Sequence, residues 1–258
     1  MKMLEDNQPK DGGSAETVDS EWKSLYKIAA IAALVIFVLW LVETIGFAIW
    51  FPPTTVIGYF TLFQSNKLLG LFDFYLLDLI SFVFFIPVFL ALYAALGRFS
   101  RSWIAIATAL VFVGNTIYLV SNTAFCMLSL SNQYAAATTE AQKTIYLAAG
   151  QALFTLFNVT NDYLAYILFS SWGIIISIVM VRSKVFSKAN GYAGILANLV
   201  ALGSIAVAFV SSTAEVVCLA VSFLFLEVWL ILFAQRLFKM SLGLGNQANL
   251  ARKEVKQE

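Results

Sequence analysis

The chain has 258 residues, 60% of them hydrophobic, with 16 basic and 15 acidic side chains and no histidine. Its mean hydropathy is +0.83, whereas a soluble domain is closer to half apolar and a quarter charged. This composition argues against a soluble enzyme, a nucleic-acid binder with a basic surface and a disulfide scaffold. Without histidine, a Ser-His-Asp triad and a His-ligated zinc site are excluded. The composition predicts a polytopic membrane protein.

Six segments are long and apolar enough to cross a bilayer, which takes about 20 residues per helix. We expect an all-α protein with transmembrane helices at 28–51, 74–96, 103–130, 163–181, 192–210 and 216–234. With a cytoplasmic N-terminus, 14 of the 16 lysines and arginines fall on the inner side, and only Lys67 and Lys143 fall outside. This positive-inside bias favours a multipass protein of the cell membrane with both termini in the cytoplasm.

Polar tails flank the predicted membrane domain. We expect residues 1–22 and 241–258 to be cytoplasmic tails and residues 23–240 to form the six-helix transmembrane domain. The first tail lacks the basic start and short apolar core of a signal peptide, so the first helix is expected to be an uncleaved signal-anchor.

Two segments between the spans are too apolar for free loops. Residues 54–73 and 138–157 are each expected to form a helix or a re-entrant segment at the outer interface of the membrane. Thr138 or Thr139 can cap the second segment, with Glu140 in its first turn.

A row of polar residues continues from the second segment into the fourth span. Its members recur at helical spacing and therefore share one face: Thr144, Gln151, Thr155, Asn158 and Asp162. This face either packs on the other outer segments or lines a vestibule that opens outward.

Acidic side chains inside the predicted spans are the main functional signal, because a charge in the bilayer core is costly. At 1.5 Å per residue, Glu43 lies about 12 Å below the outer end of the first span and Glu227 about 16 Å into the sixth. Asp78 and Asp162 lie near the outer ends of the second and fourth spans, and Asn122 lies on the third. No lysine or arginine lies in a span, so these carboxyls must be protonated, hydrogen-bonded to polar neighbours or bound to an external cation.

Three interpretations of these acids are open. They join neighbouring helices as neutral groups, or line an outward-facing pocket for a cation or proton, or bind a metal for catalysis. The last is the weakest, because transition-metal sites of that kind usually include imidazole. The candidate ligand-binding residues are Glu43, Asp78, Asn122, Asp162 and Glu227. Glu43 and Glu227 are the favoured pair, with Asp162 as the third member; no catalytic residue and no cofactor is predicted, and the metal stays open.

Small residues and cysteines leave further alternatives. Ala193, Ala197 and Ala201 recur every four residues, a spacing that suits close helix packing within the monomer or at a homodimer seam. Cys126 and Cys218 lie at similar depths, and we expect free thiols in preference to a disulfide.

Two sequence segments carry a family pattern. One contains Ser131-Asn-Gln-Tyr-Ala-Ala-Ala-Thr-Thr139 after a long span, and the other contains the basic turn Arg182-Ser-Lys-Val-Phe-Ser-Lys188. They resemble a family of prokaryotic multipass membrane proteins classed as a domain of unknown function. The resemblance covers about residues 25 to 240 and brings no catalytic motif, so it implies no role for any residue.

The sequence therefore favours a non-enzymatic integral membrane protein whose acidic outer pocket binds a cation, a cationic small molecule or a lipid. The alternative is a structural or regulatory subunit that packs against another membrane protein or a second copy of itself. A small transporter comes third and an intramembrane enzyme last. The lipid bilayer is the expected environment, and no nucleic-acid partner is expected.

Overall fold

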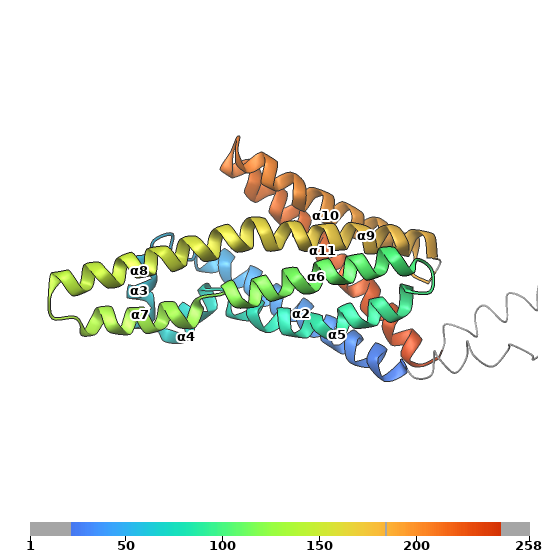
Figure 1. Ribbon diagram of the computed structural model, residues 1–258, viewed down its shortest axis with the longest axis horizontal. Coiled ribbons are helices and arrows are strands. Elements are labelled where there is room, and N and C mark those ends of the chain that lie inside the picture. Colours follow the sequence, from blue (N-terminus) through green and yellow to red (C-terminus); the bar gives the residue numbers. More distant parts are fainter. Residues whose placement is uncertain (1–21, 184, 244–258) are drawn as a thin grey trace, which may run out of the picture.

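The computed structural model describes residues 22–183 and 185–243, except for the side chain of Asp162. Within these residues the chain forms helices and no strands, arranged as an elongated bundle (Figure 1). Six helical segments are long and apolar enough to cross a membrane. The helices that form the membrane bundle within these segments are α2 (Lys23–Ile49), α5 (Leu76–Leu96), α6 (Arg101–Ser121), α9 (Tyr166–Ser183), α10 (Lys188–Ala208) and α11 (Ser212–Ser241). The predicted fold class, an all-α multipass membrane protein, is confirmed, whereas the predicted tails lie almost entirely outside the described residues.

Four further helices form a small domain at one end of the bundle, which we call the head. They are α3 (Val56–Ser65), α4 (Lys67–Asp73), α7 (Ala124–Ala136) and α8 (Glu140–Val159). Figure 1 shows α7 and α8 as an antiparallel hairpin that continues the long axis, with α3 and α4 beside it. The head has a hydrophobic core of its own, separate from the core of the bundle. The two apolar outer segments are therefore helical: the first forms α3 and α4, the second forms α8, and both contribute to the core of the head together with α7.

Local sequence explains where the head helices begin. Thr55 accepts a hydrogen bond from the backbone N–H of Gly58 and so caps α3. Thr139 and Gln142 form a reciprocal capping box at the start of α8, which satisfies amides that have no partner within the helix. Of the two predicted caps, Thr139 is the one that the structure uses.

The third membrane helix is shorter than predicted. The apolar segment 103–130 contains no charge, yet α6 ends at Ser121 and α7 starts at Ala124. Asn122 ends the helix because its side-chain oxygen accepts a hydrogen bond from the backbone N–H of Ala124 at 3.2 Å. This local bond competes with helical pairing, and the residues beyond it belong to the head.

The fourth span is longer than predicted. α8 continues through a π-helical segment, η1 (Thr160–Ala165), into α9 and forms one helix of 44 residues. At 1.5 Å per residue this helix is about 66 Å long, roughly twice the thickness of the bilayer core. Thr144, Gln151 and Thr155 of the predicted polar row are exposed on α8, so these side chains do not pack on the other outer segments.

The membrane helices pack around α2 and α9. α10 packs on α9 and α11, α11 also contacts α2, and α5 contacts both α2 and α6. Ala193, Ala197 and Ala201 are buried on α10, so the chain uses this small-residue face for its own packing. The loop between α10 and α11 leans away from the other helices (Figure 1).

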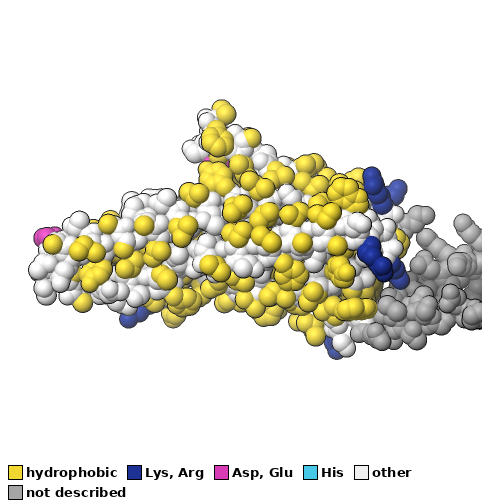
Figure 2. Space-filling view, in the orientation of Figure 1, with side chains coloured by type: hydrophobic (Ala, Val, Ile, Leu, Met, Phe, Trp, Pro, Cys, Tyr) yellow, Lys and Arg dark blue, Asp and Glu magenta, His cyan; other side chains and the backbone are white. Residues whose placement is uncertain are grey.

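Charges are distributed unevenly over the surface. Figure 2 shows hydrophobic side chains over the middle of the molecule and lysines and arginines gathered at the end opposite the head. The exposed basic side chains of that end are Lys23, Lys27, Arg98, Arg101, Arg182, Lys188 and Lys239. An apolar band with one basic rim is the surface expected of a membrane protein.

Candidate functional site

The candidate site lies where the core of the bundle meets the core of the head. Glu43 of α2, Asp78 of α5 and Tyr118 of α6 converge there, with Trp40 one turn away from Glu43. We call these four residues the junction cluster. Three different membrane helices supply it, so its geometry depends on how the helices pack.

Two carboxyl groups face each other in the junction cluster. Glu43 is only 5% exposed, and its carboxyl lies close to the carboxyl of Asp78, although Glu43 Oε1 has no hydrogen-bond partner among the described residues. The hydroxyl of Tyr118 donates a hydrogen bond to Asp78 Oδ2 at 3.1 Å. The indole nitrogen of Trp40 lies near the same carboxyl, although its hydrogen bond does not reach good geometry. Asp78 therefore accepts one hydrogen bond, from Tyr118, and has the indole N–H of Trp40 nearby.

Glu43 also lies against the start of α5. Its carboxyl approaches the backbone N–H of Asp78, which is in the first turn of that helix. Such amides have no partner within their own helix and carry part of the positive end of the helix dipole. Glu43 thus lies near the positive end of the dipole of α5.

Aromatic rings surround the two carboxyls and keep them in place. The ring of Tyr118 stacks on Phe82 with centroids 3.7 Å apart and an interplanar angle of 6°. Trp40 lies between Phe85 and Phe223, at 5.4 and 5.2 Å. These rings exclude water from one side of the cluster and strengthen its electrostatic interactions.

The N-terminal turn of α5 is fixed by Tyr75 and Asn122. Tyr75 has φ of 59°, the only positive φ of a non-glycine residue among those described, and this left-handed conformation is costly for a bulky side chain. Asn122 donates from its side-chain nitrogen to the carbonyl of Tyr75 at 3.3 Å. Asn122, predicted as a ligand-binding residue, therefore holds the turn that precedes Asp78.

A second polar contact joins α6 to the π-helical segment. Ser121 donates to Asn161 Oδ1 at 3.0 Å, and the side-chain nitrogen of Asn161 is buried without a hydrogen-bond partner among the described residues. Segments of π-helix often occur at functional sites. Asp162, the predicted third member of the site, lies in this segment, but its side chain falls outside the described residues.

Glu227 lies apart from the junction cluster. Both oxygens of its carboxyl are buried on α11 without a hydrogen-bond partner among the described residues. Trp40 of α2 contacts Phe223 of α11, so these two residues lie at the same depth in the bundle. Glu43 lies about one turn outward of Trp40, and Glu227 lies about one turn inward of Phe223. The two carboxyls are therefore roughly 10 Å apart along the bundle. The structure therefore brings Glu43 to Asp78 and leaves Glu227 separate, although the sequence favoured a pair of Glu43 and Glu227.

The head contains an acid that the sequence reasoning missed. Asp73 ends α4 and is 2% exposed, and burial raises the pKa of its carboxyl above the ordinary value. The hydroxyl of Tyr59 donates to the backbone carbonyl of Asp73 at 3.2 Å, and burial raises the pKa of this tyrosine as well. In the sequence, Asp73 is an acid at the end of the apolar segment 54–73. This position coincides with the predicted boundary between that segment and the second span.

The described residues contain no group of three acidic or cysteine side chains arranged to hold a metal ion. Cys126 and Cys218 are free thiols, as expected. The chemistry of the site is therefore that of a carboxyl pair with hydroxyl, indole and amide donors.

A family model described as a domain of unknown function, DUF4386, matches residues 28–234. The chain belongs to this family. The match confirms the resemblance seen in the sequence and covers most of the membrane bundle, the whole head and all four residues of the junction cluster. No curated protein and no solved structure matches the chain. Its six membrane-length helices make the protein an integral membrane protein, and the family description states no activity.

Proposed function

We propose that this protein is a non-enzymatic membrane protein that binds a proton at the Glu43–Asp78 pair. The observation that carries the proposal is the close approach of two carboxyls, that of the buried Glu43 and that of the half-buried Asp78. Two carboxylates so close to each other cannot both be charged. The only ion pair among the described residues joins Lys143 to Glu140 in the head, so no basic side chain neutralises the pair.

The donors around Asp78 assign the proton to Glu43. Asp78 accepts the hydroxyl of Tyr118, and a protonated Glu43 supplies a second O–H to the same carboxyl. Asp78 is then the anion, and the buried proton lies between the two side chains. A divalent cation fits this arrangement poorly, because calcium takes 6–8 oxygen ligands and magnesium needs an octahedral set.

We further propose that the cluster exchanges its proton with the outer side of a cell membrane. The supporting observation is the basic rim opposite the head (Figure 2), because the positive-inside rule favours a cytoplasmic location for that end. The outward-facing acidic pocket expected from the sequence becomes, in this proposal, a closed carboxyl pair just beneath the head.

Infrared difference spectroscopy of the purified protein tests the proposal. The wild-type protein should show a protonated-carboxyl band that shifts in D₂O, and Glu43→Gln should remove it. Glu227→Gln is the control, because it changes a buried carboxyl outside the cluster and should leave that band in place. An unchanged band in the Glu43→Gln variant would refute the proposal. If sodium or calcium stabilised the wild-type protein but not the Glu43→Gln variant, the site would bind a cation and the proposed proton site would be refuted.

The exposed surface of the head favours a second function, that of a structural or regulatory subunit. The apolar outer segments and the small-residue face of α10, which suggested this role, are used in internal packing. However, Phe125 of α7 and Ile145 and Leu156 of α8 remain exposed on the hairpin. Native mass spectrometry after purification in mild detergent tests this role, because a monomer without any partner would contradict it.

A further inference from the structure

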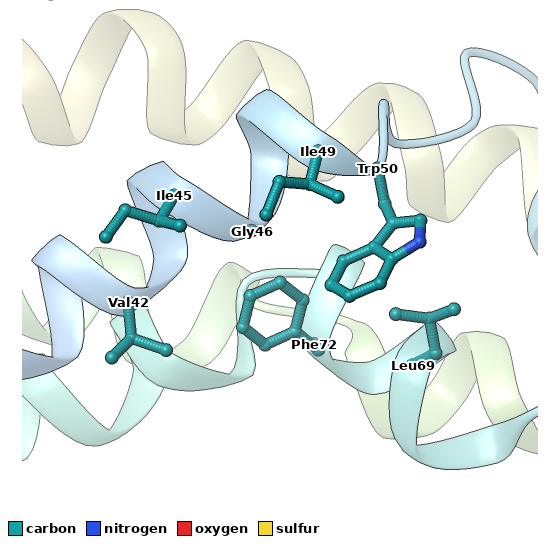
Figure 3. Close-up of a pocket in the computed structure, with 7 residues that line it drawn as sticks. All are labelled: Val42, Ile45, Gly46, Ile49, Trp50, Leu69 and Phe72. Carbon is teal, nitrogen blue, oxygen red and sulfur yellow. The ribbon is translucent and has the colours of Figure 1, made fainter.

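A groove lined by carbon atoms lies between the outer turns of α2 and helix α4. Figure 3 shows Ile45 and Ile49 of α2 on one wall, and Leu69 and Phe72 of α4 on the other. Its volume is about 340 Å³, at the lower end of the range for small-molecule sites. None of the four residues of the junction cluster lines it, so it is separate from the candidate proton site.

The groove is built into the packing of the two helices. Gly46 forms its floor, and the ring of Phe72 occupies the space into which a side chain at position 46 would extend. Ile45 and Ile49 remain 51% and 60% exposed on the side of α2 that faces away from the bundle. A hollow with a fixed floor and apolar walls on a membrane-facing surface is suited to a flexible hydrocarbon chain.

One lining residue with a polar side-chain atom, Trp50, marks the outer end of the groove, and a lysine precedes the lining residue Leu69 in the sequence. Trp50 lines this end, and Figure 3 shows its indole ring beside Phe72 with the nitrogen at the outer edge of the ring. Tryptophan at this depth places its ring in the apolar layer and its N–H near the headgroups. Lys67 begins α4, two residues before Leu69, and its side chain is exposed.

Lys67 is the one basic side chain of the head that forms no ion pair among the described residues. The other, Lys143, bonds Glu140 at 2.9 Å at the far tip of the head. The flexible stem of lysine lets its ammonium reach the headgroup layer from the start of α4. We propose that the groove binds one acyl chain of an anionic phospholipid of the outer leaflet, with its phosphate near Lys67 and the indole N–H of Trp50.

Native mass spectrometry of the full chain, released from nanodiscs that contain equal amounts of phosphatidylglycerol and phosphatidylcholine, tests this site. The wild-type protein should retain phosphatidylglycerol preferentially. Ile45→Phe fills the groove and should abolish the retained lipid, whereas Ile31→Phe changes a residue of the same helix that is 50% exposed and lies outside the groove. Loss of the lipid in both variants would show unspecific annular lipid and overturn the proposal.

The headgroup contact is tested by Lys67→Gln, with Lys143→Gln as the control. A lysine near an anionic lipid contributes about 1 kcal/mol, so Lys67→Gln should lower the retention of phosphatidylglycerol roughly fivefold. Retention of phosphatidylcholine should not change, and Lys143→Gln should behave like the wild type. Equal retention of both lipids by the wild-type protein, or an equal effect of the two lysine variants, would refute the anionic site.

Discussion

The hydrogen bond from Tyr118 to Asp78 gives the sharpest test of the charges in the junction cluster. Tyr118→Phe removes one hydroxyl and keeps the ring that stacks on Phe82. The change in stability therefore reports one hydrogen bond at 3.1 Å. Its size depends on whether the acceptor is an anion, because hydrogen bonds to charged groups contribute about 1.5–3 kcal/mol and those between neutral groups about 1 kcal/mol.

We expect Tyr118→Phe to lower the free energy of unfolding by about 2 kcal/mol in the wild-type background, since Asp78 is the proposed anion. In an Asp78→Asn background the acceptor is a neutral amide of the same shape, and the same substitution should cost only about 1 kcal/mol. Unfolding by sodium dodecyl sulfate in mixed micelles, followed by tryptophan fluorescence, measures both values. Tyr93→Phe, an exposed tyrosine of α5, is the control and should cost less than about 0.5 kcal/mol. Equal costs of Tyr118→Phe in the two backgrounds would show that Asp78 is neutral and would refute the assigned charges.

Three further predictions concern the head. Gly150→Ala should destabilise the protein by about 1–3 kcal/mol, because the added carbon would lie 2.6 Å from Val56 Cγ1; Gly203→Ala, where nothing lies within 4 Å, should be neutral or stabilising. Burial raises the pKa of Asp73, so the folded head holds this proton more tightly and stability falls as pH rises above about 4. Relative to Asp73→Asn, the wild type should therefore lose stability over that rise, and parallel pH curves would contradict the effect. Cys126 is exposed and should react with a membrane-impermeant maleimide in intact cells, whereas labelling only after permeabilisation would reverse the proposed orientation.

Most of the fold could be predicted from the sequence because the membrane imposes simple rules. Predominantly apolar segments of about 20 residues, each with at most one acid, predicted the six spans, and Thr139 with Gln142 formed a cap that depends only on nearby residues. The end of α6 could not be predicted in this way. The side chain of Asn122 ends that helix with hydrogen bonds to the amide of Ala124 and to the carbonyl of Tyr75, 47 residues away. The hydropathy of the segment does not predict the second hydrogen bond.

The partner of Glu43 was also beyond the sequence. Both α5 and α11 contact α2, so knowledge of the neighbouring helices does not decide between Asp78 and Glu227. The decision depends on depth along the bundle, where a shift of one turn moves a side chain by about 5 Å. That shift is comparable to the uncertainty of each predicted helix end, and aromatic packing around Trp40 and Tyr118 sets the actual register.

The head also has a consequence for how the chain enters the membrane during synthesis. In the proposed orientation, the residues of the head must pass through the insertion machinery to the outer side, although many of them are apolar. α3 has 10 residues and α7 has 13, each well short of the roughly 20 that would hold a segment in the bilayer. Lys67 and Lys143 are the only basic residues in the head, so little charge opposes translocation. α8 has 20 residues but carries Glu140, Lys143 and Gln151 along its length. Dividing the rest of the apolar core among short helices lets the chain export pieces that a single longer apolar helix would leave behind in the lipid.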